Sequence, residues 1–324
     1  MKTQLLQMML CLGLALFTQA FDCPTAKPGG VPVILDTDIG DDIDDTWALA
    51  LLLKSPELDL KLVVTDQGKS EYRAKIVARL LEIAGRTDVG IGLGLPVMEG
   101  EGGQAAWVKD YEISRYPGRV FRDGVQALIN TIMQSPERVT LICIGPVPNI
   151  QAALEREPRI AQRARFVGMH GSVRYGYGGK SRPEAEYNVK ANAQACRRAL
   201  SAAWDVTITP LDTCSLVRLI GDQYAAVRDC RDPLAQAVIE NYRFWLGKDR
   251  GRAEKESSTL FDPVAVYLAI SEDLLVMEKL GIRITDDGFT VIDSKAKLMK
   301  CATSWKNLPA FREFLVKRLT GQDK

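Results

Sequence analysis

The chain has 324 residues, of which 46% are hydrophobic and 26% charged, and its formal net charge is +1. This length suffices for one large α/β domain or two small ones. The balanced, interspersed charges argue against binding to nucleic acid or to an anionic membrane, and they favour a neutral or weakly charged small molecule as the ligand.

The N-terminal residues have the pattern of a secretory signal peptide. Lys2 precedes the apolar run Leu5–Phe17, and Thr18-Gln19-Ala20 resembles a small-residue cleavage site. The run is short for a membrane span, which needs about 20 residues. We therefore expect residues 1–20 to be removed from a secreted or periplasmic protein, leaving 21–324 as one α/β domain. An uncleaved membrane anchor is the alternative.

Cleavage would remove Cys11 and leave six of the seven cysteines. An even number permits disulfides in an exported chain but does not assign them. Cys143 lies in an apolar strand pattern and is expected to be a buried thiol. Cys214 and Cys230 flank a helix-like segment and could pair with each other or elsewhere. The sequence has no CxxC motif or Cys/His cluster, which argues against structural zinc.

Beyond residue 30, short apolar strands alternate with helical segments. Strands are expected at Val31–Leu35, Leu58–Thr65, Val89–Leu93, Val139–Ile144, Ala164–Met169 and Val206–Leu211. Helices are expected at Thr46–Lys54, Ser70–Arg86, Gly124–Gln134, from Asn149, and at Ala191–Trp204. The tail is expected to be mostly helical, at Ser215–Val227, Pro233–Leu246, Asp262–Ser271 and Pro309–Leu319, with short strands near Ile282–Thr285 and Thr290–Ile292. This alternation predicts an α/β fold with a mostly parallel central sheet flanked by helices.

The most informative segment is Asp36–Asp45, which reads DTDIGDDIDD and holds six carboxylates in ten residues. It follows an apolar strand and precedes an apolar helix, and ligands bind beyond the carboxyl ends of parallel strands. Carboxylates this close repel one another unless a cation neutralises them. Oxygen ligands favour Ca²⁺ or Mg²⁺. The segment therefore predicts a metal site, whereas a solvated acidic loop would need only one or two aspartates as helix caps.

An EF-hand is excluded as the source of this pattern. An EF-hand loop lies between two helices and has a glutamate at its twelfth position. Here a strand pattern precedes the loop, and Trp47 is the twelfth residue from Asp36.

Three other segments fit the same site. Ile144-Gly145-Pro146-Val147-Pro148-Asn149 joins a strand to a helix, so a carbonyl at the strand end could face the metal. Glu186 and Asn188 follow the Gly-rich loop Gly171–Gly179 and could both reach sugar hydroxyls. Asp262 directly precedes a helix, where an aspartate is by itself more often an N-cap than a ligand.

Together the four segments resemble the nucleoside hydrolase family, the inosine-uridine-preferring N-ribohydrolases, in order and spacing from about Val31 to the C-terminal helix. The resemblance implies a Ca²⁺ ion at the bottom of a ribose pocket. The metal ligands that it implies are Asp38, Asp44, Asp45, Asp262 and the Ile144 main-chain oxygen. The substrate-binding residues that it implies are Glu186 and Asn188, with Asp36 supporting the site or binding a hydroxyl.

The resemblance also implies the reaction, which is hydrolysis of the N-glycosidic bond of ribonucleosides to base and ribose. A water held by the metal would attack the anomeric carbon, with Asp38 as the catalytic base. The transition state would resemble an oxocarbenium ion. The partners implied are a small-molecule nucleoside and further copies of the chain in a homo-oligomer.

The sequence departs from the family pattern at four places. The acidic motif is two residues longer than in many members, which leaves Asp42 as a rival to Asp44 and Asp45 for the metal or as a substrate contact. Phe261 stands where many members have a histidine that protonates the leaving base. Lys69 stands where a ribose-contacting asparagine is common. The only histidine, His170, is expected to be structural, or else to line the pocket and assist the leaving group.

Two other functions stay open at this level. The departures are compatible with a non-catalytic ribose- or nucleoside-binding protein on the same scaffold, which would bind without turnover. A different metal hydrolase such as a phosphatase is less compatible, since the chain has no second metal cluster or phosphate cradle in its sequence. Trp107, Tyr175 and Tyr177 could stack on a nucleobase or serve packing alone. Nucleobase preference and disulfide pairing are not predicted.

Overall fold

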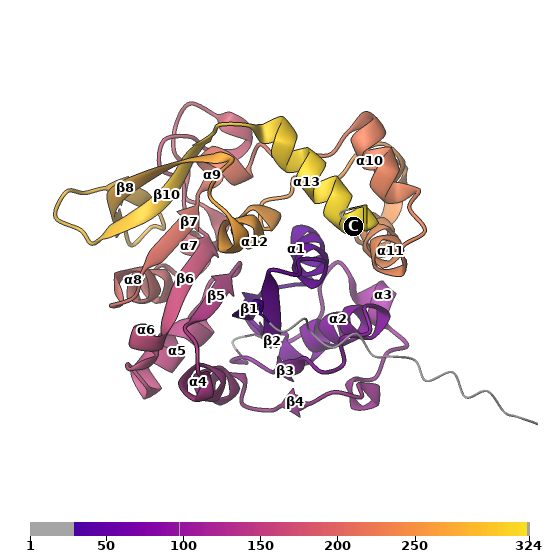
Figure 1. The fold of residues 1–324 in the computed structure, drawn as a ribbon, viewed down its shortest axis with the longest axis horizontal. Coiled ribbons are helices and arrows are strands. Elements are labelled where there is room, and N and C mark those ends of the chain that lie inside the picture. Colours follow the sequence, from indigo (N-terminus) through magenta and orange to yellow (C-terminus); the bar gives the residue numbers. More distant parts are fainter. Residues whose placement is uncertain (1–28, 97, 323–324) are drawn as a thin grey trace, which may run out of the picture.

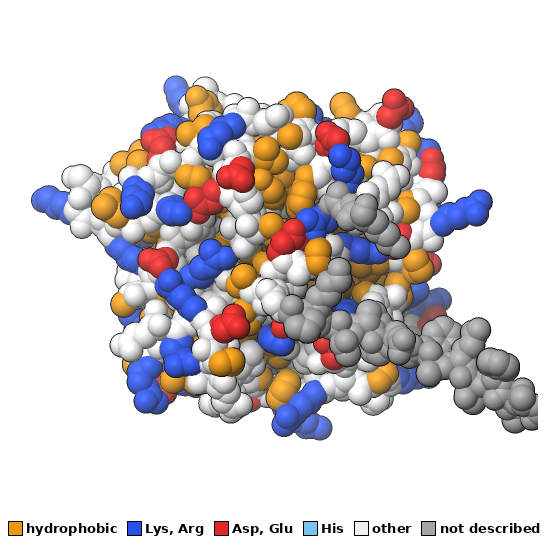
Figure 2. Space-filling model, in the orientation of Figure 1, with side chains coloured by type: hydrophobic (Ala, Val, Ile, Leu, Met, Phe, Trp, Pro, Cys, Tyr) orange, Lys and Arg blue, Asp and Glu red, His pale blue; other side chains and the backbone are white. Residues whose placement is uncertain are grey.

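The computed structural model describes residues 29–96 and 98–322 (Figure 1). The predicted signal peptide and Cys23 lie outside these residues. Within the described part, no helix combines the length and apolarity that crossing a membrane requires. Figure 2 shows Lys, Arg, Asp and Glu side chains interspersed over the visible part of one face.

The described strands form one sheet in the order β4-β3-β2-β1-β5-β6-β7-β10-β8-β9. All neighbours from β4 to β10 pair in parallel, and only β10–β8 and β8–β9 are antiparallel. The mostly parallel sheet is therefore confirmed. The strands are β1 (Val31–Thr37), β2 (Leu58–Thr65), β3 (Gly90–Gly92), β4 (Val120–Phe121), β5 (Val139–Cys143), β6 (Ala164–Met169), β7 (Val206–Thr209), β8 (Leu275–Ile284), β9 (Thr290–Ile292) and β10 (Leu298–Trp305).

Helices cover both faces of the sheet, and each face has its own apolar core. One core includes α1 (Asp44–Leu53), α2 (Ser70–Ile83), α10 (Gly221–Arg228), α11 (Pro233–Leu246), α12 (Pro263–Ile270) and α13 (Leu308–Thr320). The other includes α4 (Gly124–Gln134), α5 (Pro148–Arg156), α6 (Ile160–Arg163) and α8 (Ala193–Ser201). Short helices α3 (Ala105–Val108), α7 (Tyr187–Ala191) and α9 (Leu211–Cys214) lie in the connections.

Strand β1 explains where the acidic motif lies. Its residues Val33, Ile34 and Leu35 are fully buried, because helices pack against both faces of this central strand. Asp36, near its carboxyl end, pairs with Val64 of β2 and is in register with Cys143 of β5. The motif therefore begins at the carboxyl edge in the middle of the sheet, where parallel α/β folds bind ligands.

The C-terminal region differs from the prediction in three ways. Strand β8 begins seven residues earlier than Ile282, and β10 was predicted as neither strand nor helix. Residues 275–280 (LVMEKL) are strong helix formers, so their strand conformation depends on pairing with β10. The helix predicted at Ser215–Val227 is also wrong at its start, since the chain is not helical between α9 and α10.

The described cysteines have free thiols: Cys143, Cys196, Cys214, Cys230 and Cys301. Cys143 is buried as expected. Cys214 and Cys230 are not bonded to each other: the Cys214 thiol lies 3.2 Å from the Pro210 carbonyl, and Cys230 lies near the Thr320 carbonyl.

Candidate active site

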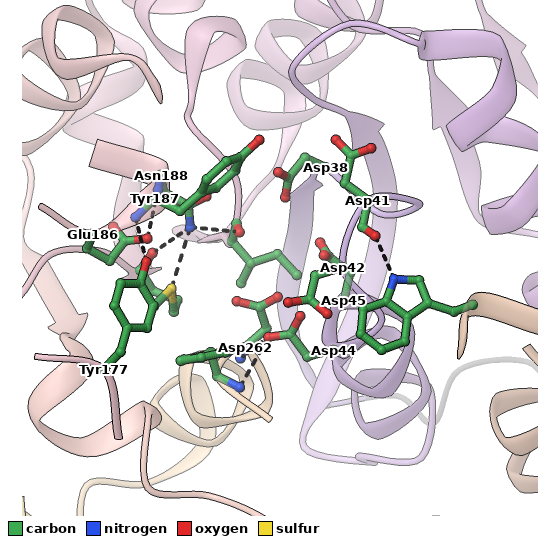
Figure 3. A pocket seen from close by; sticks show the side chains of 14 residues that line it. Asp38, Asp41, Asp42, Asp44, Asp45, Tyr177, Glu186, Tyr187, Asn188 and Asp262 are labelled. Carbon is green, nitrogen blue, oxygen red and sulfur yellow. Dashed lines mark hydrogen bonds between the residues drawn. The ribbon is translucent and has the colours of Figure 1, made fainter. Parts of the chain in front are cut away.

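A cavity of about 360 Å³ opens at the carboxyl end of the sheet (Figure 3). Its wall comes from the loop after β1, the start of α1, the ends of β5 and β6, α7, α11 and the start of α12. The side chains and carbonyls that line it belong to Asp38, Asp41, Asp42, Asp44, Asp45, Ile144, Met169, Tyr177, Glu186, Tyr187, Asn188, Trp245, Phe261 and Asp262. Most of the predicted site residues therefore meet in one place.

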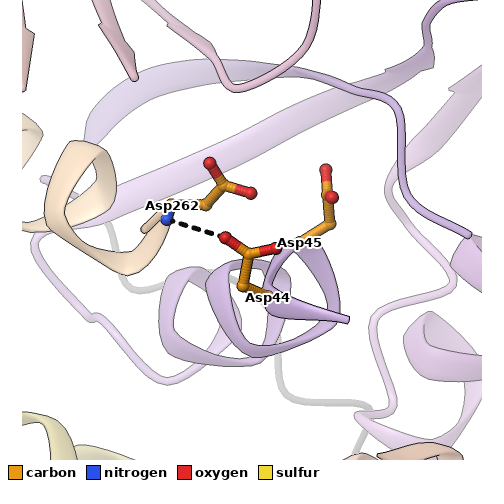
Figure 4. Close-up of side chains that lie close together, drawn as sticks. All are labelled: Asp44, Asp45 and Asp262. Atoms are coloured by element: carbon orange, nitrogen blue, oxygen red, sulfur yellow. Dashed lines mark hydrogen bonds between the residues drawn. The ribbon is translucent and has the colours of Figure 1, made fainter. Parts of the chain in front are cut away.

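Three buried carboxyls converge on the cavity floor. Oxygen atoms of Asp44, Asp45 and Asp262 all lie within 4.8 Å of one another. Asp44 also joins α1 to α12, because it accepts hydrogen bonds from the backbone N–H groups of Phe261 (3.1 Å) and Asp262 (3.3 Å; Figure 4). Asp45 accepts a 2.5 Å hydrogen bond from the Thr37 hydroxyl. Residues more than two hundred positions apart thus form one oxygen cluster.

This cluster is electrostatically unsatisfied. Burial raises the pKa of Asp44, Asp45 and Asp262 well above the usual range, and repulsion from neighbouring aspartates of the site raises each pKa further. No lysine or arginine forms an ion pair with any of the three among the described residues. Buried carboxylates in this arrangement are the donor set of a hard divalent cation.

Asp38 lies on the same wall but outside the three-carboxyl cluster. Burial raises the pKa of Asp38 to about 7, with Arg73 opposing the shift. Glycine is required at position 145, because a Cβ atom there would lie 2.8 Å from Asp66 Oδ2 and 3.1 Å from Asp38 Oδ1. The strand end after β5 can therefore approach the acidic loop closely.

Arg73 of α2 holds this loop in place from beneath. Its guanidinium is fully buried and donates to the carbonyls of Asp38 and Ile39 and, at 2.8 Å, to Asp41 Oδ2. Arg73 also donates to the Gly68 carbonyl at 2.9 Å. One buried cation thus fixes the backbone of the loop and lowers the cost of its negative charge.

Asp41 of the acidic motif is held by its own set of partners. Lys69 donates to Asp41 Oδ1 at 2.7 Å, and Trp245 Nε1 donates to the Asp41 carbonyl at 2.8 Å. Arg73 and Lys69 outweigh burial and lower the pKa of Asp41. Lys69 is thus paired with Asp41, and it lies in a segment where Gln67 and Lys69 have φ values of 54° and 50°.

Asp42 and Ile144, both considered from the sequence as metal ligands, line the cavity but are not part of the three-carboxyl cluster. Asp42 lines the cavity but is exposed, and its Oδ1 accepts a 2.6 Å hydrogen bond from the Ile43 N–H. It is not in the three-carboxyl cluster, which favours Asp44 and Asp45 over Asp42 as ligands. Ile144 also lines the cavity, and its carbonyl accepts a 3.1 Å hydrogen bond from Asn188, which leaves one lone pair for another partner.

Glu186 and Asn188 face the cluster from the other side of the cavity (Figure 3). Glu186 caps α7 by accepting hydrogen bonds from the N–H groups of Asn188, Val189 and Gly171. Burial raises its pKa to about 7 despite these bonds. Asn188 Nδ2 donates to the Ile144 and Met169 carbonyls, so its side-chain oxygen is the group left for a sugar hydroxyl.

Asp36 and His170, for each of which substrate contact was one of two roles considered from the sequence, do not line the cavity. Asp36 is buried beneath it and accepts a 2.9 Å hydrogen bond from Asn149, which fits a supporting role. His170 is fully buried, lies 5.5 Å from the Phe166 ring and contacts the Gly145 carbonyl at 3.0 Å. The structural interpretation of His170 therefore fits this geometry, and direct substrate contact does not.

Of the aromatic residues considered from the sequence, only Tyr177 lines the cavity. Its hydroxyl accepts a 2.9 Å hydrogen bond from the Tyr187 N–H, and its ring packs edge-on against Phe261. Trp107 is buried and donates to Glu240, which is a packing role, and Tyr175 is exposed elsewhere.

Comparison with known sequences decides the family. The sequence model described as inosine-uridine preferring nucleoside hydrolase matches residues 33–317. The chain belongs to the nucleoside hydrolase family. Members of this family are N-glycosyl hydrolases, so the protein is an enzyme of that class.

Sequence relatives of this nucleoside hydrolase align with most of its chain. A pyrimidine-specific ribonucleoside hydrolase (RihA) of Enterobacter sp. (strain 638) is 26% identical, covering 81% of this chain and 88% of that protein. The inosine-uridine preferring nucleoside hydrolase of Leishmania major is 28% identical, covering 81% and 87%. Among solved structures, a plant nucleoside hydrolase has a TM-score of 0.75 at 20% identity, covering 90% of this chain and 99% of that one.

Three residues of this nucleoside hydrolase site were not found from the sequence. Arg73 was hidden because it lies three residues before Ile76 on the apolar side of α2, a spacing that could have indicated burial. Trp245 and Tyr187 lie on elements whose approach to the cavity depends on tertiary packing, and no sequence signal marked them.

Proposed function

We propose that this protein is a Ca²⁺-dependent hydrolase that cleaves the N-glycosidic bond of ribonucleosides to free base and ribose. The observation that carries the proposal is the cluster of Asp44, Asp45 and Asp262 next to Asp38, within a cavity whose opposite wall bears Glu186 and Asn188. Carboxylates for a cation and polar groups for sugar hydroxyls thus share one enclosed space.

The residues present fit the cation. Asp44, Asp45 and Asp262 would hold it, with Asp38 and the Ile144 carbonyl as further ligands, because all five border the same cavity. The oxygen-only donor set favours Ca²⁺ over transition metals. When bound, such an ion supplies positive charge that orients and acidifies water and polarises sugar hydroxyls.

Asp38 is the base in this proposal. Its raised pKa, about 7, is near the value at which a carboxylate removes a proton efficiently at neutral pH. As Asp38 takes a proton from the attacking water, the water oxygen bonds to the anomeric carbon and the C1′–N bond breaks. The neighbouring carboxylates stabilise the positive charge that develops on the sugar.

Glu186 and Asn188 orient the ribose. Both are buried and fixed by backbone hydrogen bonds, so they bind sugar hydroxyls without losing side-chain freedom on binding. Arg73 contributes by holding the backbone of the loop that carries Asp38.

A panel of purine and pyrimidine nucleosides, with Ca²⁺ and with chelator, tests the proposal by release of free ribose. The panel spans both base classes because the relatives include proteins named as pyrimidine-specific and, from Gardnerella vaginalis, purine-preferring. We expect Ca²⁺-dependent ribose release from at least one nucleoside. Binding without turnover, or hydrolysis of nitrophenyl phosphate alone, would contradict the proposal.

A further inference from the structure

The cavity wall offers no strong proton donor for a departing nucleobase. Neither histidine, lysine nor arginine is among the described residues that line it. The single histidine of the chain is buried behind the wall. Phe261, which lies directly before the metal-cluster residue Asp262, cannot donate a proton.

Most ionisable groups on the wall already have partners or a proposed role. Asp44, Asp45 and Asp262 must be ionised to hold a cation, and Asp41 is paired with Lys69 and Arg73. Both Glu186 oxygens accept backbone hydrogen bonds, so this carboxyl is held in place at the start of α7. The two tyrosines are weak acids. The remaining carboxyl, Asp42, is exposed and accepts a hydrogen bond from the Ile43 N–H.

The same cavity is suited to a positively charged ligand. Seven carboxyl groups line it, and one divalent ion together with Lys69 and Arg73 offsets only part of their charge. Aromatic rings of Tyr177, Tyr187, Trp245 and Phe261 complete the wall. Aromatic faces attract cations, and so do uncompensated carboxylates.

We propose that the preferred substrates are nucleosides whose base carries a positive charge, such as N-ribosylpyridinium compounds. This inference rests on the proposed function and specifies its substrate class. When the C1′–N⁺ bond breaks, its electron pair passes to the ring nitrogen, so the base leaves as a neutral molecule and needs no proton. The attacking water bonds to C1′ and gives its proton to the Asp38 carboxylate, so the reaction needs only a base.

Binding of the base alone provides a test that does not depend on turnover. The 1-methylnicotinamide cation and neutral nicotinamide form a matched pair, and their binding to the Ca²⁺-loaded protein can be measured calorimetrically. We expect the cation to bind roughly two- to thirty-fold more tightly, the range of a cation–π contact. The preference should shrink in Trp245→Leu. Equal binding of the two compounds to the unmodified protein would overturn the inference.

Kinetics provide the second test. For each substrate, kcat/KM is divided by the rate of the uncatalysed hydrolysis. We expect this ratio to be higher for N-ribosylnicotinamide than for its neutral 1,4-dihydro form, and higher for 7-methylguanosine than for guanosine. Supplying an acid in Phe261→His should raise kcat/KM for neutral nucleosides relative to charged ones by about ten-fold or more. Phe261→Leu is the matched control, because it also removes the Phe261 ring but supplies no proton donor. It should not reproduce this change.

The outcomes separate the two proposals. Efficient hydrolysis of neutral nucleosides with no preference for charged ones would overturn the substrate class and leave the proposed function standing. So would a selective loss of neutral-nucleoside turnover in Asp42→Asn, because Asp42 would then be the missing acid. Failure of the Ca²⁺-loaded protein to release ribose from either class would overturn both proposals.

Discussion

The sheet has a charged cavity at each end, and only one of them looks like an active site. The acidic cavity lies at the carboxyl ends of the parallel strands. A second cavity, of about 480 Å³, lies at their amino ends. Five basic side chains line it, together with Asp205 and Glu272: Arg138, Arg165, Lys279, Lys297 and Lys300. The larger cavity is thus at the end of the sheet where α/β folds do not bind ligands.

The difference lies in how each cavity's charges are compensated. In the basic cavity Arg138 pairs with Asp205 at 2.7 Å, and Lys300 pairs with Glu272 at 2.8 Å. Lys297 donates to the Leu200 carbonyl in the last turn of α8 and to the Ala202 and Trp204 carbonyls that follow it, an interaction typical of a structural helix end. In the acidic cavity the three clustered carboxyls have no cationic partner among the described residues. Clustered charges that are both buried and unpaired, rather than cavity size, therefore identify the functional end.

The sharpest contrast between the two cavities is expected from replacing one aspartate in each. Asp38→Ala should lower kcat by about 10²–10⁴-fold or more, because the base and a metal ligand are lost together. Asp205→Ala, in the basic cavity, should leave kcat within about two-fold, since it removes only a partly exposed ion pair. Steady-state ribose release at saturating Ca²⁺ measures both. Near wild-type turnover in Asp38→Ala would show that the base is misassigned.

Chelation should be the next largest effect. A ligand that binds only the folded state stabilises it, by about 2.7 kcal/mol at one hundred times its Kd. EDTA should therefore lower the Tm of the wild type. In Asp262→Asn the Tm should respond little to Ca²⁺, and in EDTA this variant should be at least as stable as the wild type because one repelling carboxylate is gone.

Asp262→Asn isolates the electrostatic effect because Asp262 makes no side-chain cap hydrogen bond at the start of α12. Scanning calorimetry of both proteins, with Ca²⁺ and with EDTA, gives the four Tm values needed. A wild-type Tm that EDTA does not change, in protein shown by elemental analysis to lose its metal, would count against the cluster as a metal site.

Much of the site was predictable because the acidic motif combines metal-binding side chains with a position directly after a buried strand. A buried strand followed by six carboxylates placed Asp38, Asp44 and Asp45 at the carboxyl edge of the sheet, and the structure has them there. Asp262 was different, since by itself it is an ordinary residue before a helix. Only the resemblance to a family linked it to Asp44, from which it is 218 positions distant.

The residues that escaped prediction act through tertiary contacts. Arg73 is a charged residue on a helix, and nothing in the local sequence shows that it donates to four backbone carbonyls and to Asp41. The β8–β10 pair escaped for a related reason, because long-range strand pairing overrides the helix propensity of Leu275–Leu280. The local sequence pattern predicts helices and strands whose buried residues recur at regular spacing. It fails where a single long-range contact determines the conformation or the role of a residue.

The pKa of His170 can show whether this residue is buried behind the acidic cavity or in contact with it. Burial lowers its pKa to about 4, below the value of about 6.5 in an unfolded chain. Between these values the unfolded state binds more protons, so the stability contributed by neutral His170 is complete above pH 6.5 and declines as the pH falls toward 4. At pH 5 the loss should be about 2 kcal/mol.

Urea unfolding of the wild type and His170→Gln at pH 7 and pH 5 isolates this effect, because the carboxyls titrate in both proteins. The variant should lose less stability on acidification. As the only histidine, His170 also gives a single imidazole signal by NMR, with an expected midpoint below about 5. A midpoint near 6.5 that shifts on adding ribose would place His170 in contact with the cavity.

The smallest effect is expected in the basic cavity, from Lys297→Met. The change keeps most of the apolar stem but removes the ammonium that donates to the carbonyls of Leu200, Ala202 and Trp204. Water can replace some of these bonds because the side chain is only partly buried, so we expect a loss of about 1 kcal/mol of unfolding free energy. Ribose release should not change. If Lys297→Met impaired turnover as much as it impaired stability, the two ends of the sheet would be coupled, and the basic cavity would need a functional explanation of its own.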